Sequence, residues 1–525
     1  MPDTLPSAVP PTAPTAVPPA STDLAAAARA AAATGTLASY VASCLSAEDP
    51  DALHVDAARE MLRDVMTPVA RTETVGLLQA LGRSLSEAIH APIDVPSFDN
   101  AAMDGYAFDG TLLDVDPRPA TLTLTVVGQA YAGHPMTRTV RAGECARVMT
   151  GAPMPPGTDT LIPHEYAVGV GATHADDTND VADVGGQADQ AGQTGTAASA
   201  YPVTRDVVLS TANFRKGSNR RRVGEDVQRG QIVFETGRTL RAPDLGVLAS
   251  LGIASVRVRA RLRVAFFSTG DELYPVGSDL PPGGLYDSNR YTLHGMLTRL
   301  GVEAIDLGVV RDDPTALSEA LQRAAACADA VISSGGVSAG DADFVRDVFS
   351  KAGDIVFWKL AMRPGRPFAF GLLSSATGHG NANAACAIPF FGLPGNPVAV
   401  VASFYHIVRD ALLIAMGAAP QAPPRIRARL EAGVRKRAGR TEFARGIARR
   451  GRALPTGREQ HDVEAGAEFD AASADEDWRV ALSGAQGSGV LSSMSKGNCF
   501  IILPHDSADL HAGDWVDIVF FEGLI

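Results

Sequence analysis

Between about residues 263 and 417, short apolar runs alternate with segments of helical periodicity. The apolar runs are RVAFFS, VEAIDLGVV, DAVISS and AIPFFGL, and the helical segments are RYTLHGMLTRLG, TALSEALQRAAA, FVRDVFSKA and VAVVASFYHIVRDAL. This alternation is typical of βαβ units, whose parallel strands are buried by helices on both faces. The region therefore predicts a central α/β domain with a mostly parallel sheet, and ligands of such sheets bind beyond the carboxyl ends of the strands.

The rest of the chain predicts a multidomain protein of α/β plus β class. VDAAREMLRDV and TVGLLQALGRSLSEAI have helical spacing, whereas TLTLTVVGQ, RDVVLS and QIVFETGRTL read as short strands. ARLEAGVRK, WRVALSGAQ, CFIILP and WVDIVFF predict a separate β domain at the end of the chain. We expect a helical and β linking domain, a small β unit with flanking helices, the α/β domain and a C-terminal β domain, at 49–90 with 231–258, 91–230, 259–420 and 421–525, respectively.

Several segments are unsuited to a packed core. Residues 1–48 are rich in Pro, Ala, Ser and Thr, and we expect a disordered tail. Residues 167–204 contain no Lys or Arg before Thr204 and many Gly, Ala, Asp and Thr, so they predict a disordered surface insertion. Residues 374–385 and 454–478 predict two shorter insertions of the same kind.

Charge and cysteine content exclude several classes of function. Lys and Arg total 46 against 59 acidic residues, a net charge of −13, which argues against nucleic acid or an anionic membrane as partner. An anionic substrate must therefore meet a local basic cluster. The five cysteines form no CxxC pair, so free thiols are expected rather than a zinc or redox site. With neither a secretory signal nor a run of eighteen apolar residues, we expect a cytoplasmic protein.

One loop of the predicted α/β domain has the composition of a phosphate site. Gly335 and Gly336 follow the run DAVISS, and glycines let backbone N–H groups approach an anion closely. Ser338 adds a hydroxyl donor. A Gly pair alone is more often a simple turn, so the acidic residues that follow it carry part of the argument.

Four carboxylates would gather at the same edge of this sheet: Glu272, Asp312, Asp341 and Asp343. Their mutual repulsion is costly without a cation, and Mg²⁺ bound through carboxylate and phosphate oxygens would relieve it. The alternative is that Asp341 and Asp343 only cap the helix that follows.

Basic residues flank a Pro-Gly turn in the same domain. Lys359, Arg363 and Arg366 lie within eight positions in KLAMRPGRP and could hold an oxyanion. A solvated surface loop is the alternative, and the position between two strands of one sheet favours an anion site.

Taken together, nine strings resemble the MoeA and gephyrin E-domain family: DNAAMDGYA, RVMTGAP, RRVGED, STGDEL, YDSNR, SSGGVSAGDADF, RPGRPFAFG, GLPGNPV and QGSG occur in family order. The resemblance implies an elongated subunit of four domains and a homodimer with its site between the α/β domain of one copy and the small β domain of the other. The implied reaction converts adenylylated molybdopterin and molybdate into molybdenum cofactor and AMP, with Mg²⁺.

The resemblance also implies residue roles. Asp104 and Thr150 of one subunit would face Glu272, Asp312 and Asp343 of the other, with Lys359 and Arg363 completing the catalytic set and Asp226 and Asp341 the metal set. Substrate would be bound by a further group: Gly335, Gly336, Ser338, Arg366, Pro394, Pro397, Arg445 and Ser488. Pro394 and Pro397 would fix a loop wall, while Arg445 and Ser488 would close the cleft.

Two departures from the family pattern and two alternative functions stand beside this interpretation. Arg363 and Arg366 replace the usual lysines, which exchanges point donors for planar forks, and Gly489 replaces a usual histidine. The alternatives are a molybdopterin adenylyltransferase, which shares the α/β fold, and a gephyrin-like scaffold. An insertase would also contact the adenylyltransferase that supplies its substrate.

Overall fold

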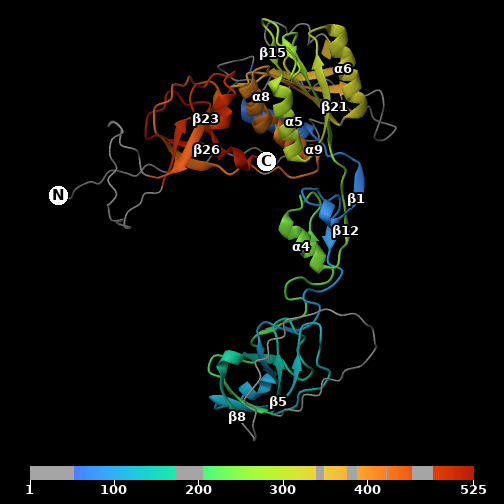
Figure 1. The fold of residues 1–525 in the computed structure, drawn as a ribbon, viewed down its shortest axis with the longest axis vertical. Coiled ribbons are helices and arrows are strands. Elements are labelled where there is room, and N and C mark those ends of the chain that lie inside the picture. Colours follow the sequence, from blue (N-terminus) through green and yellow to red (C-terminus); the bar gives the residue numbers. More distant parts are fainter. Residues whose placement is uncertain are drawn as a thin grey trace, which may run out of the picture.

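The computed structural model describes residues 52–171, 205–337, 348–349, 351–374, 387–420, 422–451 and 477–524. The protein is elongated and bent (Figure 1). A small β domain lies at one end, a linking domain follows, and the α/β domain and the C-terminal β domain lie side by side at the other end. The expected tail and most of the three expected insertions lie outside the described residues.

The α/β domain is built on a six-stranded sheet of order β16-β13-β17-β21-β20-β18. The first four strands are parallel and β20 is antiparallel to both of its neighbours, which confirms the mostly parallel sheet. The strands are β13 (Arg263–Thr269), β16 (Glu303–Val310), β17 (Ala330–Ser334), β18 (Gly353–Lys359), β20 (Pro367–Ser374) and β21 (Ala387–Leu393).

Helices cover both faces of this sheet. Along β13, Phe266 packs against α5 (Ser288–Leu300), whereas Phe267 packs on the opposite face against α6 (Pro314–Cys327). Such alternation follows from the pleat of a strand buried on both sides. A long helix made of α8 (Pro397–Ser403), a π-helical turn at Phe404–Val408 and α9 (Arg409–Ala415) completes the face with α5.

Helix α3 (Val55–Val65) forms as its periodicity predicts, but it packs against α9 in the core of the α/β domain. The assignment of residues 49–90 to the linking domain is therefore corrected for this helix. Its apolar face, with Ala58, Met61 and Leu62, is buried beside the α9 residues Ala411 and Leu412.

The linking domain contains strands where helix was expected. TVGLLQALGRSLSEAI includes part of β1 (Thr72–Gly76), a 3-10 turn at Leu77–Gln79 and part of β2 (Ile89–His90). The helical prediction was wrong because β12 (Ser255–Arg259) supplies a strand partner from far along the chain, and Gly82 has a φ of 73° that a helix does not allow. Helix α4 (Ala242–Ser250) and β11 (Ile232–Phe234) complete this domain.

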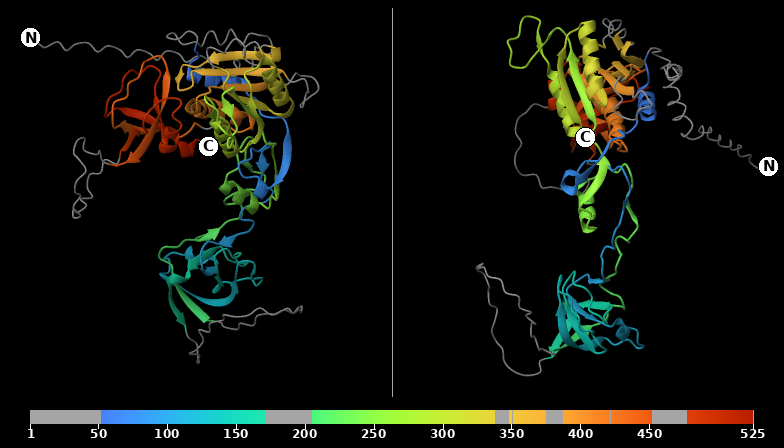
Figure 2. Two further views of the ribbon diagram at one scale, coloured as in Figure 1. Left: turned by 45° about the horizontal axis from the view of Figure 1, so that its top comes forward. Right: turned by 90° about the vertical axis from the view of Figure 1, so that its right-hand side faces the viewer.

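The small β domain is a six-stranded sheet of order β7-β4-β6-β5-β9-β8. Its strands are β4 (Gly105–Phe108), β5 (Thr121–Ala130), β6 (Glu144–Val148), β7 (Thr160–Pro163), β8 (Ala167–Gly171) and β9 (Arg205–Ser210). The expected insertion was placed too early, because Ala167–Gly171 pairs with β9 as an edge strand. Two narrow chain crossings join this domain to the linking domain (Figure 2).

The C-terminal domain is a curved sheet of order β19-β23-β24-β22-β26-β25 that closes through a further pairing of β23 with β25. Its strands are β22 (Ile426–Leu430), β23 (Thr441–Arg450), β24 (Trp478–Leu482), β25 (Cys499–Leu503) and β26 (Trp515–Phe520). The short strand β19 (Met362–Arg363) enters this sheet from the α/β domain.

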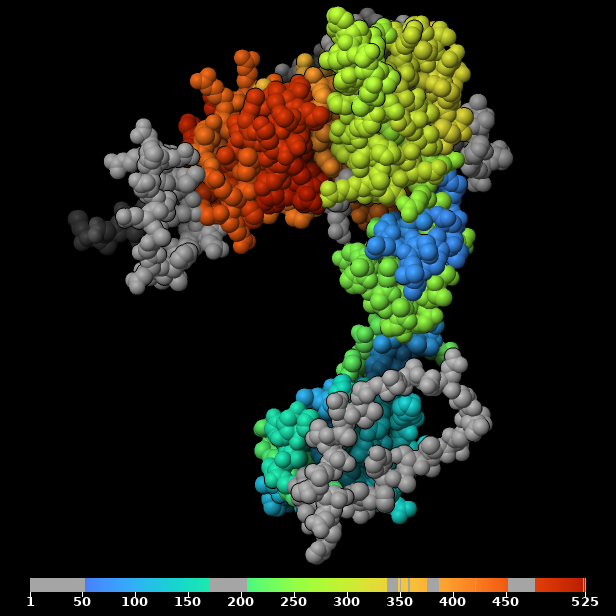
Figure 3. All heavy atoms as spheres, in the orientation of Figure 1, coloured from blue at the N-terminus to red at the C-terminus, as the bar shows by residue number. Residues whose placement is uncertain are grey.

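The C-terminal domain is less separate than the sequence indicated. Phe443, Phe500 and Val519 belong to the same hydrophobic cluster as α5, α8 and α9. The two domains therefore form one continuous body, and the space-filling view shows them in contact, apart from the small β domain (Figure 3). One described helix, Pro397–Ala415, is long and apolar enough to cross a membrane, but 78% of it is buried in the protein, as in a core helix.

Candidate active site at the edge of the α/β sheet

Five chemistry-bearing segments meet at one edge of the α/β sheet. The parallel strands β13, β16, β17 and β21 end there, followed by Gly270, Arg311, Gly335 and Pro394, respectively. Because β20 runs antiparallel to both β21 and β18, the turn from β18 to β20 also lies at this edge. That turn carries Lys359, Arg363 and Arg366.

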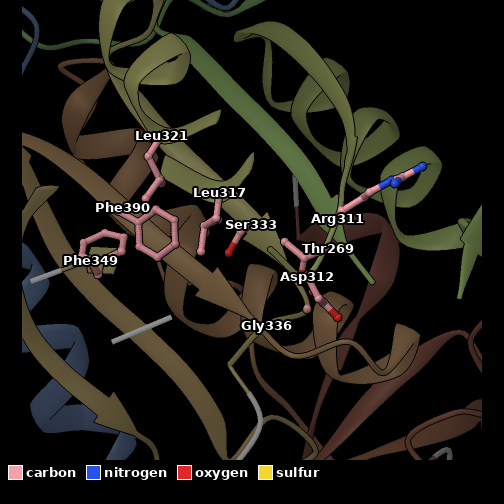
Figure 4. Close-up of a pocket in the computed structure, with 10 residues that line it drawn as sticks. Thr269, Arg311, Asp312, Leu317, Leu321, Ser333, Gly336, Phe349 and Phe390 are labelled. Carbon is pink, nitrogen blue, oxygen red and sulfur yellow. The ribbon is translucent and has the colours of Figure 1, made fainter. Parts of the chain in front are cut away.

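The glycine pair lines a small hollow at this edge. Gly335 and Gly336 have φ angles of 94° and 70°, which favour glycine, and a Cβ on Gly335 would stand 2.5 Å from the Thr269 carbonyl oxygen. The hollow is small and partly open to solvent, and its polar side also includes Ser333 and Asp312. Figure 4 shows Asp312 and Thr269 near Gly336, with the Arg311 side chain pointing away.

The acidic residues divide between site and scaffold. Asp313 accepts a hydrogen bond from Ala316 N (2.8 Å) and caps α6, which leaves Asp312 to line the hollow. Asp312 N donates to Asp271 (3.3 Å), so the loops after β13 and β16 touch. The carboxylate of Glu272 lies back over its own loop, where a Cβ on Gly270 would meet it within 2.9 Å.

The metal-binding prediction is only partly met by the structure. Among the described residues no group of three or more His, Cys, Asp or Glu side chains could hold a metal ion. Asp226 lies near Val95, where the chain enters the small β domain, and does not join Glu272 and Asp312 within one chain. Ser338, Asp341 and Asp343 lie outside the described residues.

The basic turn is anchored to the C-terminal domain. Arg363 is paired through its backbone with Glu442, and its Nη1 lies 3.6 Å from the buried Glu442 carboxylate. Glu442 also accepts a hydrogen bond from Arg440 Nε (2.9 Å). Arg363 itself is exposed, so part of its guanidinium fork stays available to an anion.

Arg445 lies inside the C-terminal domain instead of on a cleft wall. Its side chain is 1% exposed, and it donates to Ser493 Oγ (3.0 Å), Ala485 O (3.2 Å) and Gly487 O (3.0 Å). Burial, and then the charge of Arg363, lower the pKa of Arg445. The prediction that Arg445 closes the cleft directly is corrected: it shapes the loop that carries Ser488.

This loop contacts the α/β domain beside Pro397. Ser488 O accepts a hydrogen bond from Val398 N in the first turn of α8 (3.1 Å). Pro394 is buried at the start of the loop that leads from β21 into α8. A Cβ on Gly489 would lie 4.0 Å from Asn396 Oδ1. The position where the family has histidine therefore faces the loop that contains Pro394 and Pro397.

Asp104 and Thr150, which the family resemblance assigns to one site, are in contact on the small β domain. Thr150 donates from its Oγ1 (2.6 Å) and its N (2.7 Å) to Asp104 Oδ1. The Thr150 hydroxyl and then its amide lower the pKa of Asp104. Gly105 is required here because a Cβ would stand 2.3 Å from Ile162 O in the neighbouring strand.

Sequence reasoning gave no role to several residues that organise the edge. Asp287 and Asn289 were quoted only as part of YDSNR, and Glu442 and Gln486 were given no role. Gln486 accepts from Arg445 N (2.8 Å) and donates to Arg445 O (3.1 Å), so it mimics a strand partner. The signal that could have found Asp287 and Asn289 is the polar cluster directly before a helix next to a predicted strand end.

Three family models match the chain. The MoeA N-terminal region (domains I and II) matches residues 53–252, a probable molybdopterin binding domain matches 265–413, and the MoeA C-terminal region (domain IV) matches 469–521. The three matches fall on the linking and small β domains, the α/β domain and the C-terminal domain, respectively.

Molybdopterin molybdenumtransferases of other organisms match most of the chain. A molybdopterin molybdenumtransferase of Haemophilus influenzae is 35% identical over 90% of this chain and 100% of the relative. A molybdopterin molybdenumtransferase of Nostoc sp. is 33% identical and covers 65% of this chain and 69% of the relative. The crystal structure of a MoeA protein from Pyrococcus horikoshii is 26% identical, covers 90% of this chain and 100% of its own, and superposes with a TM-score of 0.66. The chain belongs to the MoeA family.

Proposed function

We propose that this protein inserts molybdate into adenylylated molybdopterin and releases AMP, as a molybdopterin molybdenumtransferase. The observation that carries the proposal is the meeting, at one sheet edge, of a glycine phosphate loop, an acidic loop and a basic turn. A phosphoanhydride and an oxometalate are the anions that such a combination suits. Membership of the MoeA family supports the same reaction.

The proposal gives each segment a physical task. The Gly335 N–H is used by Leu393 O, so the N–H of Gly336, on the turn that Gly335 shapes, would bind substrate phosphate. Lys359, Arg363 and Arg366 would neutralise molybdate and the pterin phosphate. Ser488 would border the molybdate site from the C-terminal domain. Water attack on the phosphoanhydride would split it into AMP and the phosphate that stays on the pterin. The two dithiolene thiols would bind molybdenum by replacing an oxo ligand of molybdate, which would leave as water.

The proposal includes Mg²⁺. Asp312 lines the hollow beside the glycine loop, and Glu272 lies on the loop that touches the Asp312 loop. Mg²⁺ in such sites is usually held by one or two carboxylates plus substrate phosphates. The donor set therefore fits the ion without an all-protein cage. When bound, Mg²⁺ would stabilise the negative charge that develops as the phosphoanhydride breaks.

The proposal also includes a homodimer. Asp104 and Thr150 lie on the small β domain, which is far from the α/β domain of its own chain (Figure 1). A second copy could bring the partner subunit's Asp104 and the partner subunit's Thr150 to this edge. We further propose that the dimer works in the cytoplasm and receives its substrate from the adenylyltransferase. The free thiols Cys145, Cys327 and Cys499 fit a reducing compartment.

The test is a turnover assay with purified protein, adenylylated molybdopterin, molybdate and Mg²⁺. We expect AMP release and activation of a cofactor-free molybdoenzyme, both lost when EDTA replaces Mg²⁺. Formation of adenylylated molybdopterin from ATP and molybdopterin, without molybdate-dependent AMP release, would show an adenylyltransferase instead. Absence of both activities in a folded dimer would favour a scaffold.

A further inference from the structure

A buried polar cluster lies beneath the functional edge, at the start of helix α5. It contains Ser268 at the end of β13, Ser334 at the end of β17, and Asp287 and Asn289 at the helix N-terminus, none of them more than 8% exposed. Asp287 Oδ1 accepts from Ser268 Oγ (3.0 Å) and from Arg290 N (3.1 Å). Asp287 therefore fixes the helix to β13 and caps it.

Asn289 makes a different connection, because it joins two loops of the site. Its amide Nδ2 donates to Ser334 Oγ (2.8 Å), directly before the glycine pair, and to Gly395 O (2.7 Å), in the loop between Pro394 and Pro397. The carbonyl oxygen of Gly395 can only accept, so the donating nitrogen must face it and the amide orientation is fixed. Both N–H bonds of the amide are thus used, one on each loop.

The two loops lie close together at this point. Gly335 N donates to Leu393 O (3.0 Å), and a Cβ on Gly395 would lie 3.8 Å from Gly335 Cα. The Asn289 Oδ1 is buried and has no hydrogen-bond donor within the described part of the chain. An unpaired buried oxygen is unfavourable, and the two hydrogen bonds that the Asn289 amide nitrogen donates offset this cost and hold the side chain in place.

We propose that Asn289 is a positioning residue, which sets the separation of the phosphate loop at Gly335 from the loop at Gly395 and thereby the fit of the adenylylated substrate. The inference rests on the proposed function, since that function places substrate phosphate at the loop that contains Gly335 and Gly336. Asn289 does not touch substrate. It acts through Ser334 and Gly395, whose backbones continue into the two loops.

The consequence of losing the amide is a looser site on an intact scaffold. Asn289→Ala leaves Ser334 Oγ and Gly395 O without their shared donor, so the loops are joined less tightly beyond the Gly335 N to Leu393 O bond. Because the phosphate is held in the ground state as well as during reaction, the loss should be seen mainly in binding, with a smaller change in kcat. We expect KM for adenylylated molybdopterin and the dissociation constant of AMP to rise at least tenfold.

Ser268→Ala is the matched control. It removes a buried hydrogen bond from the same cluster, on Asp287, but that bond does not join the two loops. We expect both variants to lower the melting temperature, whereas only Asn289→Ala weakens AMP binding, measured by isothermal titration with AMP as the ligand. In Ser268→Ala the AMP dissociation constant should stay within twofold of that of the unchanged protein.

A second pair of variants tests the route of the effect. Asn289→Asp keeps the side-chain volume but cannot donate to Gly395 O, so it should also weaken AMP binding, and it carries the test should the alanine variant fail to fold. Ser334→Ala removes one of the two acceptors. If Asn289 acts through Ser334, combining Ser334→Ala with Asn289→Ala should weaken binding less than the sum of the single effects.

The outcomes separate this inference from the function on which it rests. An unchanged protein that binds no AMP and releases none from adenylylated molybdopterin would end the proposed function. An unchanged protein that does both, while Asn289→Ala and Asn289→Asp bind AMP within twofold of Ser268→Ala, would overturn the positioning role alone.

Discussion

Low pH should destabilise the interface between the α/β domain and the C-terminal domain through one buried histidine, His406. Its ring lies parallel to Phe443 (centroids 3.7 Å apart, interplanar angle 12°) and edge-on to Phe500 (4.8 Å). The ring nitrogen Nε2 is buried without a hydrogen-bond partner among the described residues. Burial, and then the charges of Arg59, Arg425 and Arg409, hold the pKa of His406 well below 6.5.

The sign and size of the effect follow from linkage between protonation and folding. His406 stays neutral in the folded protein, whereas in the unfolded chain it gains a proton as the pH falls below about 6.5. Its favourable contribution is therefore complete above that pH and is lost below it, down to the lowered pKa of the folded state. At pH 5.0, one and a half pH units below 6.5, the loss is about 2 kcal/mol.

The assay compares the unchanged protein with His406→Phe, which keeps a ring in the stack and cannot be protonated. Urea unfolding followed by tryptophan fluorescence reports on the right part of the molecule, because Trp358, Trp478 and Trp515 all belong to the two joined domains. We expect the unchanged protein to lose about 2 kcal/mol more than the variant between pH 7.5 and pH 5.0. A packing defect in the variant would affect both pH values alike, so equal pH dependence in the two proteins would refute the reasoning.

Three further predictions concern the site and its supports. Thr150→Val removes the hydroxyl that donates to Asp104, so the pKa of Asp104 should rise and the acid limb of the pH–rate profile for AMP release should move to higher pH, with an unchanged melting temperature. Gly335→Ala forces an alanine to a φ of 94° against Thr269 and should cost about 2 kcal/mol of stability in urea unfolding, with at least tenfold weaker AMP binding by titration calorimetry. Arg71→Ala removes one of two arginine partners of Asp329 and should destabilise the protein by about 1 kcal/mol at pH 7, because Arg71 is partly exposed and Arg263 still pairs with Asp329. Burial raises the pKa of Asp329, but the hydrogen bonds from Arg71 and Arg263 outweigh burial, so the net pKa is below its ordinary value. The loss of stability in Arg71→Ala should therefore become smaller as the pH drops below the ordinary aspartate range.

Local pattern was enough to predict the α/β sheet and the edge that carries the site. The runs at β13, β17 and β21 are largely buried on both faces, and β16 is the half-buried edge strand; all four lie next to clear helices, so their periodicity and their neighbours agree. The polar loops then had to meet at one edge because parallel strands end together. Asp104 and Thr150, by contrast, were joined only by the family resemblance, and the structure supplies their hydrogen bonds.

Long-range pairing explains what the sequence could not predict. The segment around Leu77 has helical spacing, yet its backbone partners lie in β12, some 180 residues along the chain. The family resemblance assigned Arg445 to the substrate, but its three acceptors are uncharged oxygens of Ala485, Gly487 and Ser493, which no charge pattern in the sequence could indicate. The role of Asn289 could not be predicted for a similar reason, because it depends on the distance between two loops that are far apart in the sequence.

The pairing of β19 with β23 has a consequence for how this protein could be divided. Met362 and Arg363 are numbered within one domain but complete the sheet of the next, where they pair with Thr441 and Glu442. A fragment that stops near residue 420 would retain the glycine loop and the strand ends, yet it would release the backbone that orients Arg363. The position of the basic turn therefore depends on both domains. Replacing either domain by an unrelated one would change the orientation of Arg363.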